Sequence, residues 1–505
     1  MSGGGTAPLR EAGSMNDKST RREFLRQSSS LVAGSGLAGL AGACADRSSR
    51  APAEAAGRRP NFLFFFPDQH RYDWIGLDGY PAPLATPNMA RLARTGVNFT
   101  SAVCAAPTCA PSRSCLASGM EYDRCGVRDN QYDYPVDRPT YHGLLRDNGY
   151  HTMACGKLDL SKGSSDWGLD GTNRADAWGF SAMINNAGKG AGMYYLREPF
   201  GPSDPYYAYL DSLEPPQGRI CAEDMTRRNA SRPEGWWGDT TPSPLGPEAY
   251  CDNWIASNGL DLLEQAPVDK PWHLVVNFVG PHPPMDITRE MDQTVRGPER
   301  VLDGLGLPHN YTGSFTAEQH LGSRRNYAAM IENIDMWLGR YIDWLEERGQ
   351  LENTIIVYSS DHGEMLGEHG RWGKGVPYRA SVGVPLLVAG PGVRRGFQTG
   401  TPVSIMDLAA TFLDYGGVDV PMEMDSRSLR PLLEGEIDSH REVVLSGLRD
   451  FRMVWDGRYK LVRDYGDREW RLWDLLADPE ESRNLASWQP DQVRRLREQL
   501  PERRA

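Results

Sequence analysis

A cysteine opens the part of the sequence that is richest in residues able to do chemistry. Cys109 begins the run CAPSRSCLASG, which holds Arg113 and a second cysteine, Cys115. The run is too polar for a core strand, and we expect a helix from about Pro111 to a stop at Gly119, with Cys109 at its N-terminus. Free N–H groups there favour an anion and lower the pKa of a thiol. On these residues alone, Cys109 is a disulfide partner, a metal ligand, a nucleophile or the precursor of a modified residue.

Four short apolar runs, typical of buried parallel strands, end in polar residues. The runs are NFLFFF at 61–66, YHTMACGK at 150–157, WHLVVNFVGPH at 272–282 and NTIIVYSSDHG at 353–363. The polar residues at their ends are Asp68 and Gln69, Lys157 and Asp159, His282, and Asp361 and His362. One Asp or His after a strand is often only a turn former. Four such strand ends predict one site, because ligands bind at the carboxyl ends of strands in open α/β sheets.

The oxygen-rich part of this set predicts a metal site. Asp68, Gln69 and Asp361 offer oxygen ligands, and His362 offers one nitrogen. This set suits Ca²⁺, with Mg²⁺ as the second choice, better than zinc. Soft sulfur is a poor partner for Ca²⁺, which suggests that Cys109 is not used as a plain cysteine. Positive charge to clamp a tetrahedral oxyanion beside a metal comes from Lys157, Arg113 and Lys374.

Strand and helix patterns alternate along the chain and predict the scaffold. TPNMARLARTG predicts a helix with Thr86 as N-cap and a stop at Gly96, and IENIDMWLGRYIDWLEERG predicts another that ends at Gly349. Such alternation predicts an α/β fold with a central, mostly parallel sheet and helices on both faces. Residues 160–250 lack clear periodicity, so we expect long surface loops or an insertion that shapes a cleft. From residue 440, short alternating strands predict a small antiparallel sheet and a terminal helix.

The first 45 residues predict an export signal. STRREFLR is a twin-arginine pattern, and the apolar, Gly-rich stretch after it is too short to span a bilayer. We therefore expect the twin-arginine export machinery as a partner and a periplasmic or cell-surface location. Cys44 follows small residues, so cleavage with a free N-terminus and a lipid anchor at Cys44 both stay open. The expected domains are the signal at 1–45, a linker at 46–59, a catalytic domain at 60–439 and a C-terminal subdomain at 440–505.

Composition and charge narrow the functional classes. The 505 residues are 39% hydrophobic and 24% charged, which is ordinary for a globular protein with a sizeable core. The net charge of -12 argues against a general nucleic-acid binder, which needs a basic face. Eight cysteines with no CxxC pair argue against a disulfide scaffold and a zinc site.

At these residues the sequence resembles the formylglycine-dependent sulfatases of the alkaline phosphatase superfamily. Their signature, a C-x-P-S-R core followed by Leu and Gly, reads here as CAPSRSCLASG. Further family blocks occur in the family order over most of residues 60–480, among them PNFLFFFPDQH, GPHPP, TIIVYSSDHGEMLGEHGRWGKG and VPLLVAGPGV. The tail YKLV and LWDLLADPEESRNLA matches the family's C-terminal subdomain. The resemblance implies an alkaline-phosphatase-like fold and hydrolysis of sulfate esters.

The resemblance also implies roles for the site residues. A maturation enzyme would oxidise Cys109 to formylglycine, whose hydrate is the nucleophile. The implied metal ligands are Asp68, Gln69, Asp361, His362 and the modified Cys109. Arg113 would support the hydrate, Lys157 and Lys374 would hold sulfate oxygens, and His282 would protonate the leaving alcohol. One hydrate oxygen attacks sulfur, the bond to the alcohol breaks, and loss of a proton from the second hydroxyl releases sulfate and restores the aldehyde.

Two positions depart from the family pattern. Most members have G-K-x-H, whose histidine helps release the sulfate. Here GKLD places Asp159 at that position, as a catalytic group, a helix cap or a salt-bridge partner. Arylsulfatase K-like sulfatases also carry G-K-L-D, and they remove 2-O-sulfate from glucuronate. A 2-O-sulfated uronate within a sulfated saccharide is therefore the expected substrate. Arg379 replaces the usual Glu near Lys374, and it either contacts an acidic sugar or is a solvated surface residue.

Two other functions stay open at this stage. A phosphonate monoester or phosphodiester hydrolase can share the same signature, formylglycine and metal pair. An exported polysaccharide-binding protein without catalysis would keep Cys109 unmodified.

Overall fold

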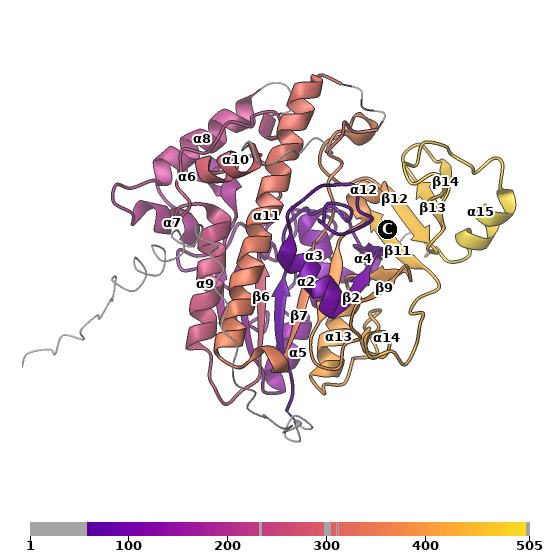
Figure 1. Ribbon diagram of the computed structural model, residues 1–505, viewed down its shortest axis with the longest axis horizontal. Helices are drawn as coiled ribbons and strands as arrows, with labels where there is room; N and C mark the ends of the chain where they lie inside the picture. The colour runs from indigo at the N-terminus through magenta and orange to yellow at the C-terminus, as the bar shows by residue number, and fades with distance from the viewer. Residues whose placement is uncertain (1–57, 232–234, 297–304, 310, 312, 501–505) are drawn as a thin grey trace, which may run out of the picture. The chain divides into compact units, whose positions relative to one another are not determined.

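The computed structural model describes residues 58–500, apart from 232–234, 297–304, 310 and 312 (Figure 1). The predicted export signal at 1–45, the lipid-anchor candidate Cys44 and nearly all of the predicted linker lie outside the described residues. Among the helices that are described, none is long and apolar enough to cross a membrane.

A central sheet of eight strands organises the chain, in the order β5-β4-β6-β1-β7-β8-β2-β9. The strands are β5 (Ala182–Asn185), β4 (His151–Gly156), β6 (Trp272–Asn277), β1 (Asn61–Phe65), β7 (Thr354–Ser359), β8 (Leu386–Ala389), β2 (Gly96–Phe99) and β9 (Phe397–Thr399). Only β8 runs antiparallel to its neighbours, β7 and β2. The four predicted apolar runs are the adjacent strands β4, β6, β1 and β7, so their carboxyl ends lie side by side at one edge.

The two faces of the sheet carry separate hydrophobic cores, and strand β1 contributes to both. Phe62 and Phe64 belong to one core, with the helices α3 (Cys109–Ser118), α5 (Tyr141–Asp147) and α13 (Asp407–Tyr415). Leu63 and Phe65 belong to the other core, with α2 (Pro87–Thr95), α9 (Cys251–Gln265) and α11 (Ala317–Glu347). Because successive side chains of a strand point to opposite faces, a wholly apolar strand requires this double cover. The predicted α/β fold is confirmed.

The remaining elements are short and lie between these layers or at their rims. Two-stranded pairing joins β3 (Ala102–Val103) to β10 (Val403–Ser404). The other helices are α4 (Tyr122–Cys125), α6 (Gly192–Tyr195), α7 (Pro205–Asp211), α8 (Gly218–Ala230), α10 (Arg289–Arg296), α12 (Arg379–Val382), α14 (Arg430–Glu434) and α15 (Pro490–Arg497). Single turns of 3₁₀ helix lie at η1 (Lys189–Ala191), η2 (Gly235–Trp237), η3 (Leu351–Asn353) and η4 (Glu368–Gly370).

The stretch 160–250 is more ordered than we expect from its sequence. It contains β5 and the helices α6, α7 and α8, and its residues Tyr207, Leu210 and Met225 are fully buried in the second core. Asp204 caps α7 by accepting from the Tyr207 N–H at 3.0 Å. The periodicity is weak because these helices are short and their buried positions include tyrosines and cysteines. The expectation of long surface loops is therefore wrong for the parts of this stretch that form these helices and β5.

The C-terminal subdomain is a four-stranded antiparallel sheet, as predicted. Its strands β11 (Val444–Leu448), β12 (Phe451–Trp455), β13 (Tyr459–Asp464) and β14 (Trp470–Asp474) pair in sequence order. Figure 1 shows this sheet in yellow beside the main body, with β11 next to α4 and α15 on the outer side.

Candidate active site

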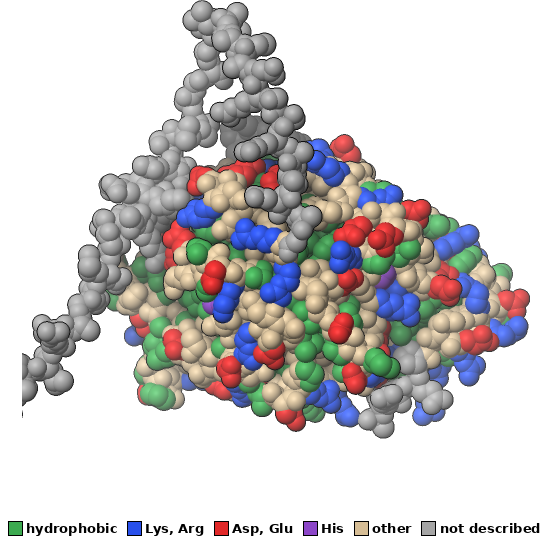
Figure 2. Space-filling view, turned by 90° about the horizontal axis from the view of Figure 1, so that it is seen from below, with side chains coloured by type: hydrophobic (Ala, Val, Ile, Leu, Met, Phe, Trp, Pro, Cys, Tyr) green, Lys and Arg blue, Asp and Glu red, His purple; other side chains and the backbone are tan. Residues whose placement is uncertain are grey.

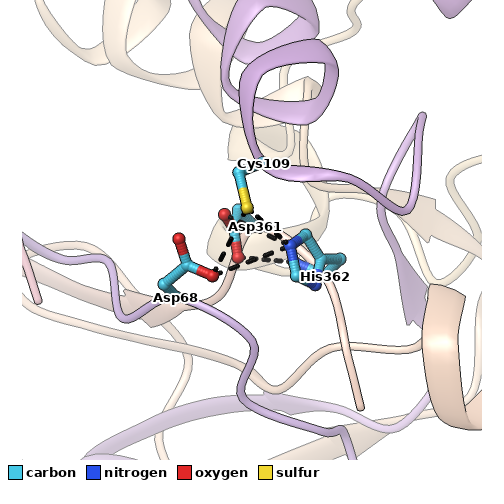
Figure 3. Close-up of side chains that lie close together, drawn as sticks. All are labelled: Asp68, Cys109, Asp361 and His362. Carbon is cyan, nitrogen blue, oxygen red and sulfur yellow. Dashed lines mark hydrogen bonds and ion pairs between the residues drawn. The ribbon is translucent and has the colours of Figure 1, made fainter. Parts of the chain in front are cut away.

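The carboxyl edge of the central sheet gathers the predicted site residues. Asp68 follows β1, Asp361 and His362 follow β7, and Cys109 is the first residue of α3 (Figure 3). The helix thus begins two residues before the predicted start, and it ends at Gly119, whose left-handed conformation closes it as expected. All four side chains are fully buried, and their ligand atoms lie within 4.8 Å of one another.

The donor atoms in this group fit a hard divalent cation. Cys109 Sγ lies 3.3 Å from His362 Nε2 and 3.7 Å from Asp68 Oδ1. His362 Nδ1 faces the Gly363 carbonyl at 3.0 Å, so Nδ1 carries the ring proton and Nε2 keeps its lone pair. Two carboxylates, a thiol and an imidazole nitrogen around one point form a donor set that a divalent cation can bind.

Charged neighbours and burial shift the pKa values of the groups at this site. Burial and the nearby Asp68 raise the pKa of Asp361 above its usual range. The pKa of His362 is also raised, because Asp361 and Cys109 outweigh the effect of burial. Burial and Asp68 raise the pKa of the Cys109 thiol, but Lys157, Lys162 and Lys374 outweigh them and lower it to about 5.

Arg113 holds the two carboxylates in place from the first turns of α3. Its Nε donates to Asp361 Oδ2 at 2.9 Å, and one terminal nitrogen lies 3.4 Å from Asp68 Oδ2. The other terminal nitrogen donates to Asn277 Oδ1 at 2.9 Å, at the end of β6. Its guanidinium, 3% exposed, therefore ties β1, β6, β7 and α3 together beneath Cys109.

Lys157 and Asp159 continue the site along β4. Lys157 forms an ion pair with Asp68, lies 3.7 Å from Cys109 Sγ and lies 3.2 Å from Asp159 Oδ2. Burial would raise the pKa of Asp159, but Lys157, Lys162 and Arg113 lower it to about 2. Asp159 is thus a buried, ionised group that holds lysines, which agrees with the salt-bridge interpretation of this position.

Gln69 and Lys374 bond to each other and lie beside the four side chains Asp68, Cys109, Asp361 and His362, called the metal-type group below. The Gln69 backbone N–H donates to Asp361 Oδ1 at 2.9 Å, its amide oxygen accepts from Lys374 and its amide nitrogen donates to Glu364. Glu364 is fully buried and also accepts from the Gly373 N–H at 2.6 Å. It therefore orients Gln69 and fixes the loop that carries Lys374.

His282 lies after β6, half-buried, at the same edge of the sheet. Its Nδ1 faces the Pro283 carbonyl at 2.6 Å, so Nδ1 carries the proton and Nε2 is a hydrogen-bond acceptor. Burial and the charges of Lys374 and Lys157 hold its pKa well below the usual range. Proton donation from His282, as the resemblance implies, thus requires a substrate anion that offsets these lysines.

Arg379, a predicted substrate-binding residue, makes its contacts away from the metal-type group. Its guanidinium lies 4.2 Å from the centre of the Tyr72 ring and 5.4 Å from that of Trp455, and it donates to the Thr100 carbonyl at 3.0 Å. These contacts join the main body to the C-terminal sheet. They differ from both expectations, a contact with an acidic sugar and a solvated surface residue, because a planar guanidinium stacks well on aromatic rings.

Sequence reasoning missed four residues that support the site: Lys162, Ser112, Asn277 and Glu364. Ser112 Oγ donates to the Asp361 carbonyl at 2.5 Å, and Asn277 receives Arg113. Glu364 belongs to the block SSDHGE, and its place three residues after Asp361 was a usable signal. Lys162 has no motif that marks it, because its contact with Asp159 depends on the turn between them.

Comparison with known families is consistent with this geometry. The model of the sulfatase family matches residues 60–418. A second model, described as the C-terminal part of N-sulphoglucosamine sulphohydrolase, matches residues 367–505.

Individual relatives share most of their length with this chain. An arylsulfatase of Clostridium perfringens is 26% identical, over 85% of this chain and 90% of its own. Arylsulfatase K of Xenopus laevis is 27% identical, over 83% of this chain and 77% of its own. Two solved structures share the fold. One, in complex with its substrate D-glucosamine-2-N,6-O-disulfate, has a TM-score of 0.67 at 21% identity and covers 88% of this chain and 97% of its own. The other, a phosphonate monoester hydrolase from Silicibacter pomeroyi, has a TM-score of 0.69 at 22% identity and covers 87% of this chain and 94% of its own.

Proposed function

Because this chain belongs to the sulfatase family, whose members are sulfuric ester hydrolases, we propose that it removes sulfate from a sulfated saccharide. The observation that carries the proposal is Cys109, a fully buried thiol at a helix N-terminus beside two carboxylates and an imidazole. We propose that a formylglycine-generating enzyme converts Cys109, and that the aldehyde hydrate supplies the nucleophilic oxygen. Membership of an enzyme family sets aside the non-catalytic, polysaccharide-binding interpretation.

We further propose a divalent cation held by Asp68, Gln69, Asp361, His362 and the modified residue 109. The oxygen-rich donor set favours Ca²⁺ over Mg²⁺. When bound, such an ion would draw negative charge away from a sulfate oxygen. Removal of the metal by a chelator should abolish sulfate release, and Ca²⁺ should restore it more fully than Mg²⁺. Full activity in the chelated protein would contradict the proposal.

Side chains around the proposed sulfate position would bind its oxygens, align the carboxylates and transfer a proton. Lys157 and Lys374 would hold sulfate oxygens, and Arg113, which bonds to Asp68 and Asp361, would keep both carboxylates aligned with residue 109. His282 would bind the bridging oxygen and pass a proton to the leaving alcohol once the substrate's charge has offset the lysines.

The proposed substrate is a 2-O-sulfated uronate. Support comes from GKLD at 156–159 and from the similarity to arylsulfatase K, whose motif this chain shares. Figure 2 shows acidic and basic side chains interspersed over the face seen from below. The net charge of the chain is -12, so an anionic sugar would rely on the lysines at the site for attraction. Export by the twin-arginine pathway, with or without a lipid anchor at Cys44, is proposed from the N-terminal pattern alone.

One experiment tests the proposed function against its runner-up, a phosphonate monoester or phosphodiester hydrolase of the same fold. Purified protein from its native host is assayed on an aryl sulfate and on phenyl phosphonate, and the peptide that holds Cys109 is weighed by mass spectrometry. We expect faster sulfate release, the mass of formylglycine, and complete loss of turnover in a folded Cys109→Ala variant. Much faster phosphonate cleavage, or an intact thiol in active protein, would overturn the proposal.

A further inference from the structure

Lys162 ends a buried chain of alternating charges that begins at the metal-type group. Asp68 pairs with Lys157, Lys157 pairs with Asp159, and Asp159 pairs with Lys162. Both lysines reach the same oxygen of Asp159, Oδ2, with Lys157 at 3.2 Å and Lys162 at 2.5 Å. A single carboxylate therefore serves two ammonium groups, and the chain carries positive charge at its outer end.

Lys157 and Lys162 differ in how many hydrogen-bond donors they have left for a ligand. An ammonium group has three N–H donors. Lys157 directs its donors to Asp68, Asp159 and Cys109, and its side chain is only 5% exposed. Within the described part of the chain, Lys162 has Asp159 as its ion-pair partner, and its side chain is 24% exposed. Lys162 thus keeps two donors and a surface that a ligand can reach.

Lys162 also lies near the reaction centre. Its partner atom, Asp159 Oδ2, lies 3.2 Å from Lys157 Nζ, which in turn lies 3.7 Å from Cys109 Sγ. Two side chains, Asp159 and Lys157, therefore separate the Lys162 ammonium from Cys109, next to which a substrate sulfate is expected. Lys157 uses its donors within the site, and Lys374 bonds to Gln69 beside the metal-type group, so Lys162 is the lysine at the outer end of this chain of charges.

We propose that Lys162 binds a second anionic group of the substrate, a carboxylate or another sulfate next to the sulfate that is cleaved. This inference rests on the proposed sulfatase function and deepens it, because it makes Lys162 a specificity residue for acidic saccharides. Asp159 is the positioning residue: it holds the Lys162 ammonium in place and uses one of its donors. Neutralising Asp159 alone would not require a second lysine, because Lys157 already lies within ion-pair distance of it.

The test compares matched substrates. A uronide and the corresponding neutral glycoside carry one sulfate at the same position and differ only in a carboxylate against a hydroxymethyl group. A third glycoside carries a second sulfate in place of the carboxylate. The sulfate position is the one that the wild type prefers, and kcat and KM are measured for wild type, Lys162→Gln and Lys162→Arg.

We expect Lys162→Gln to lower the ratio of kcat/KM for the acidic over the neutral substrate about tenfold to hundredfold, mainly through KM. Lys162→Arg should keep most of the preference, and added salt should erode it in the wild type but not in Lys162→Gln. Lys270→Gln is the matched control and should leave the ratio unchanged. Lys270 is exposed and precedes β6, whereas the site lies at the other, carboxyl end of that strand. Whichever acidic substrate responds identifies the anion.

An unchanged ratio in Lys162→Gln, or equal losses on acidic and neutral substrates, would overturn the inference. Failure of the proposed function has a different signature, because the wild type would then release sulfate from none of these esters and from no aryl sulfate.

Discussion

Asp159 carries a charge that the site cannot easily do without. Its carboxylate has 1% of its surface exposed, yet three cations hold its pKa at about 2 against the opposing effect of burial. It is therefore ionised at any working pH and cannot donate a proton in the resting enzyme. A histidine at this position would offer a proton and a neutral ring, whereas Asp159 offers an anchor for Lys157 and Lys162.

Asp159→Asn should slow turnover more than it weakens substrate binding. The amide keeps the shape of the side chain but no longer holds two ammonium groups. Because Lys157 beside residue 109 would then be misplaced, we expect kcat to fall by roughly a hundredfold. Steady-state kinetics on the preferred sulfate ester measure the effect, with Asp166→Asn, a partly exposed partner of Arg174, as control. A loss confined to KM would show that Asp159 acts only by positioning Lys162 for substrate binding.

Residues that follow a motif could be predicted, and those that depend on a turn could not. The side chains after β1, β4, β6 and β7 converge because parallel strands share one edge, which the apolar runs already indicate. Lys162, and the contacts that Arg379 makes, could not be predicted, because they depend on how side chains cross a turn or stack on aromatic rings. No periodicity in the sequence records such contacts.

Helix α13 shows how one buried acid can join several elements. Asp407, its first residue, accepts from Arg441 Nε at 2.8 Å, from the Arg427 N–H at 2.8 Å and from the Ser404 N–H at 3.3 Å. His440 Nε2 lies 3.1 Å from the same carboxylate. The acid thus joins the start of α13 to strand β10 and to the segment before β11.

Asp407→Asn should destabilise the protein by about 3–5 kcal/mol, because it leaves the buried Arg441 without its partner. Burial raises the pKa of Asp407, but Arg441 and His440 lower it below the usual value. The stabilisation is therefore full above an unfolded pKa of about 4 and is lost as the pH falls through the lower folded pKa.

Denaturant unfolding at a series of pH values checks this expectation. The gap between wild type and Asp407→Asn should be constant near pH 7 and close below about pH 4. Asp414→Asn, on the same helix but in a partly exposed pair with Arg430, should cost less than about 1 kcal/mol. A gap that persists unchanged in acid would show that Asp407 acts through shape rather than charge.

Long or strongly apolar elements could be predicted, while boundaries and short elements could not. The predicted helix that ends at Gly349 is confirmed, but α11 begins at Ala317, where Thr316 and Gln319 form a capping box. Thr86 precedes α2 as predicted, yet its hydroxyl accepts from the Gly76 N–H at 2.9 Å instead of capping the helix. A hydrogen bond from a distant backbone N–H thus uses the Thr86 hydroxyl that the local sequence predicts as a helix cap.

At the scale of the whole molecule, the C-terminal sheet takes part in building the site. Lys460 on β13 is buried, donates to the Pro377 carbonyl at 2.6 Å and pairs with Glu481. Glu481 in turn accepts from the Arg379 N–H at 2.6 Å. Pro377 and Arg379 belong to the segment that follows Lys374, so the small sheet fixes the loop that carries a sulfate-binding candidate.

Lys460→Met should therefore reduce both stability and activity. The lone Glu481 left in the interior should cost about 3–5 kcal/mol, and the released loop should lower kcat/KM. A double variant, Lys460→Met with Glu481→Leu, removes both buried charges and should recover most of the stability. Its kcat/KM should stay low, because the Pro377 carbonyl and the Arg379 N–H still lack their partners on Lys460 and Glu481. Recovery of activity together with stability would show that Lys374 does not depend on this contact.

The complete burial of Cys109 limits when, as well as where, another enzyme can reach its thiol. Its cover comes partly from Asp361 and His362, which leave the ribosome long after the cysteine, and the loop near Lys374 awaits residues later still. The proposed formylglycine-generating enzyme would therefore have only the interval before these segments fold in which to reach this thiol. The active fraction of the protein would then be decided by a race between two rates, and a molecule that folded first would stay inactive for its lifetime.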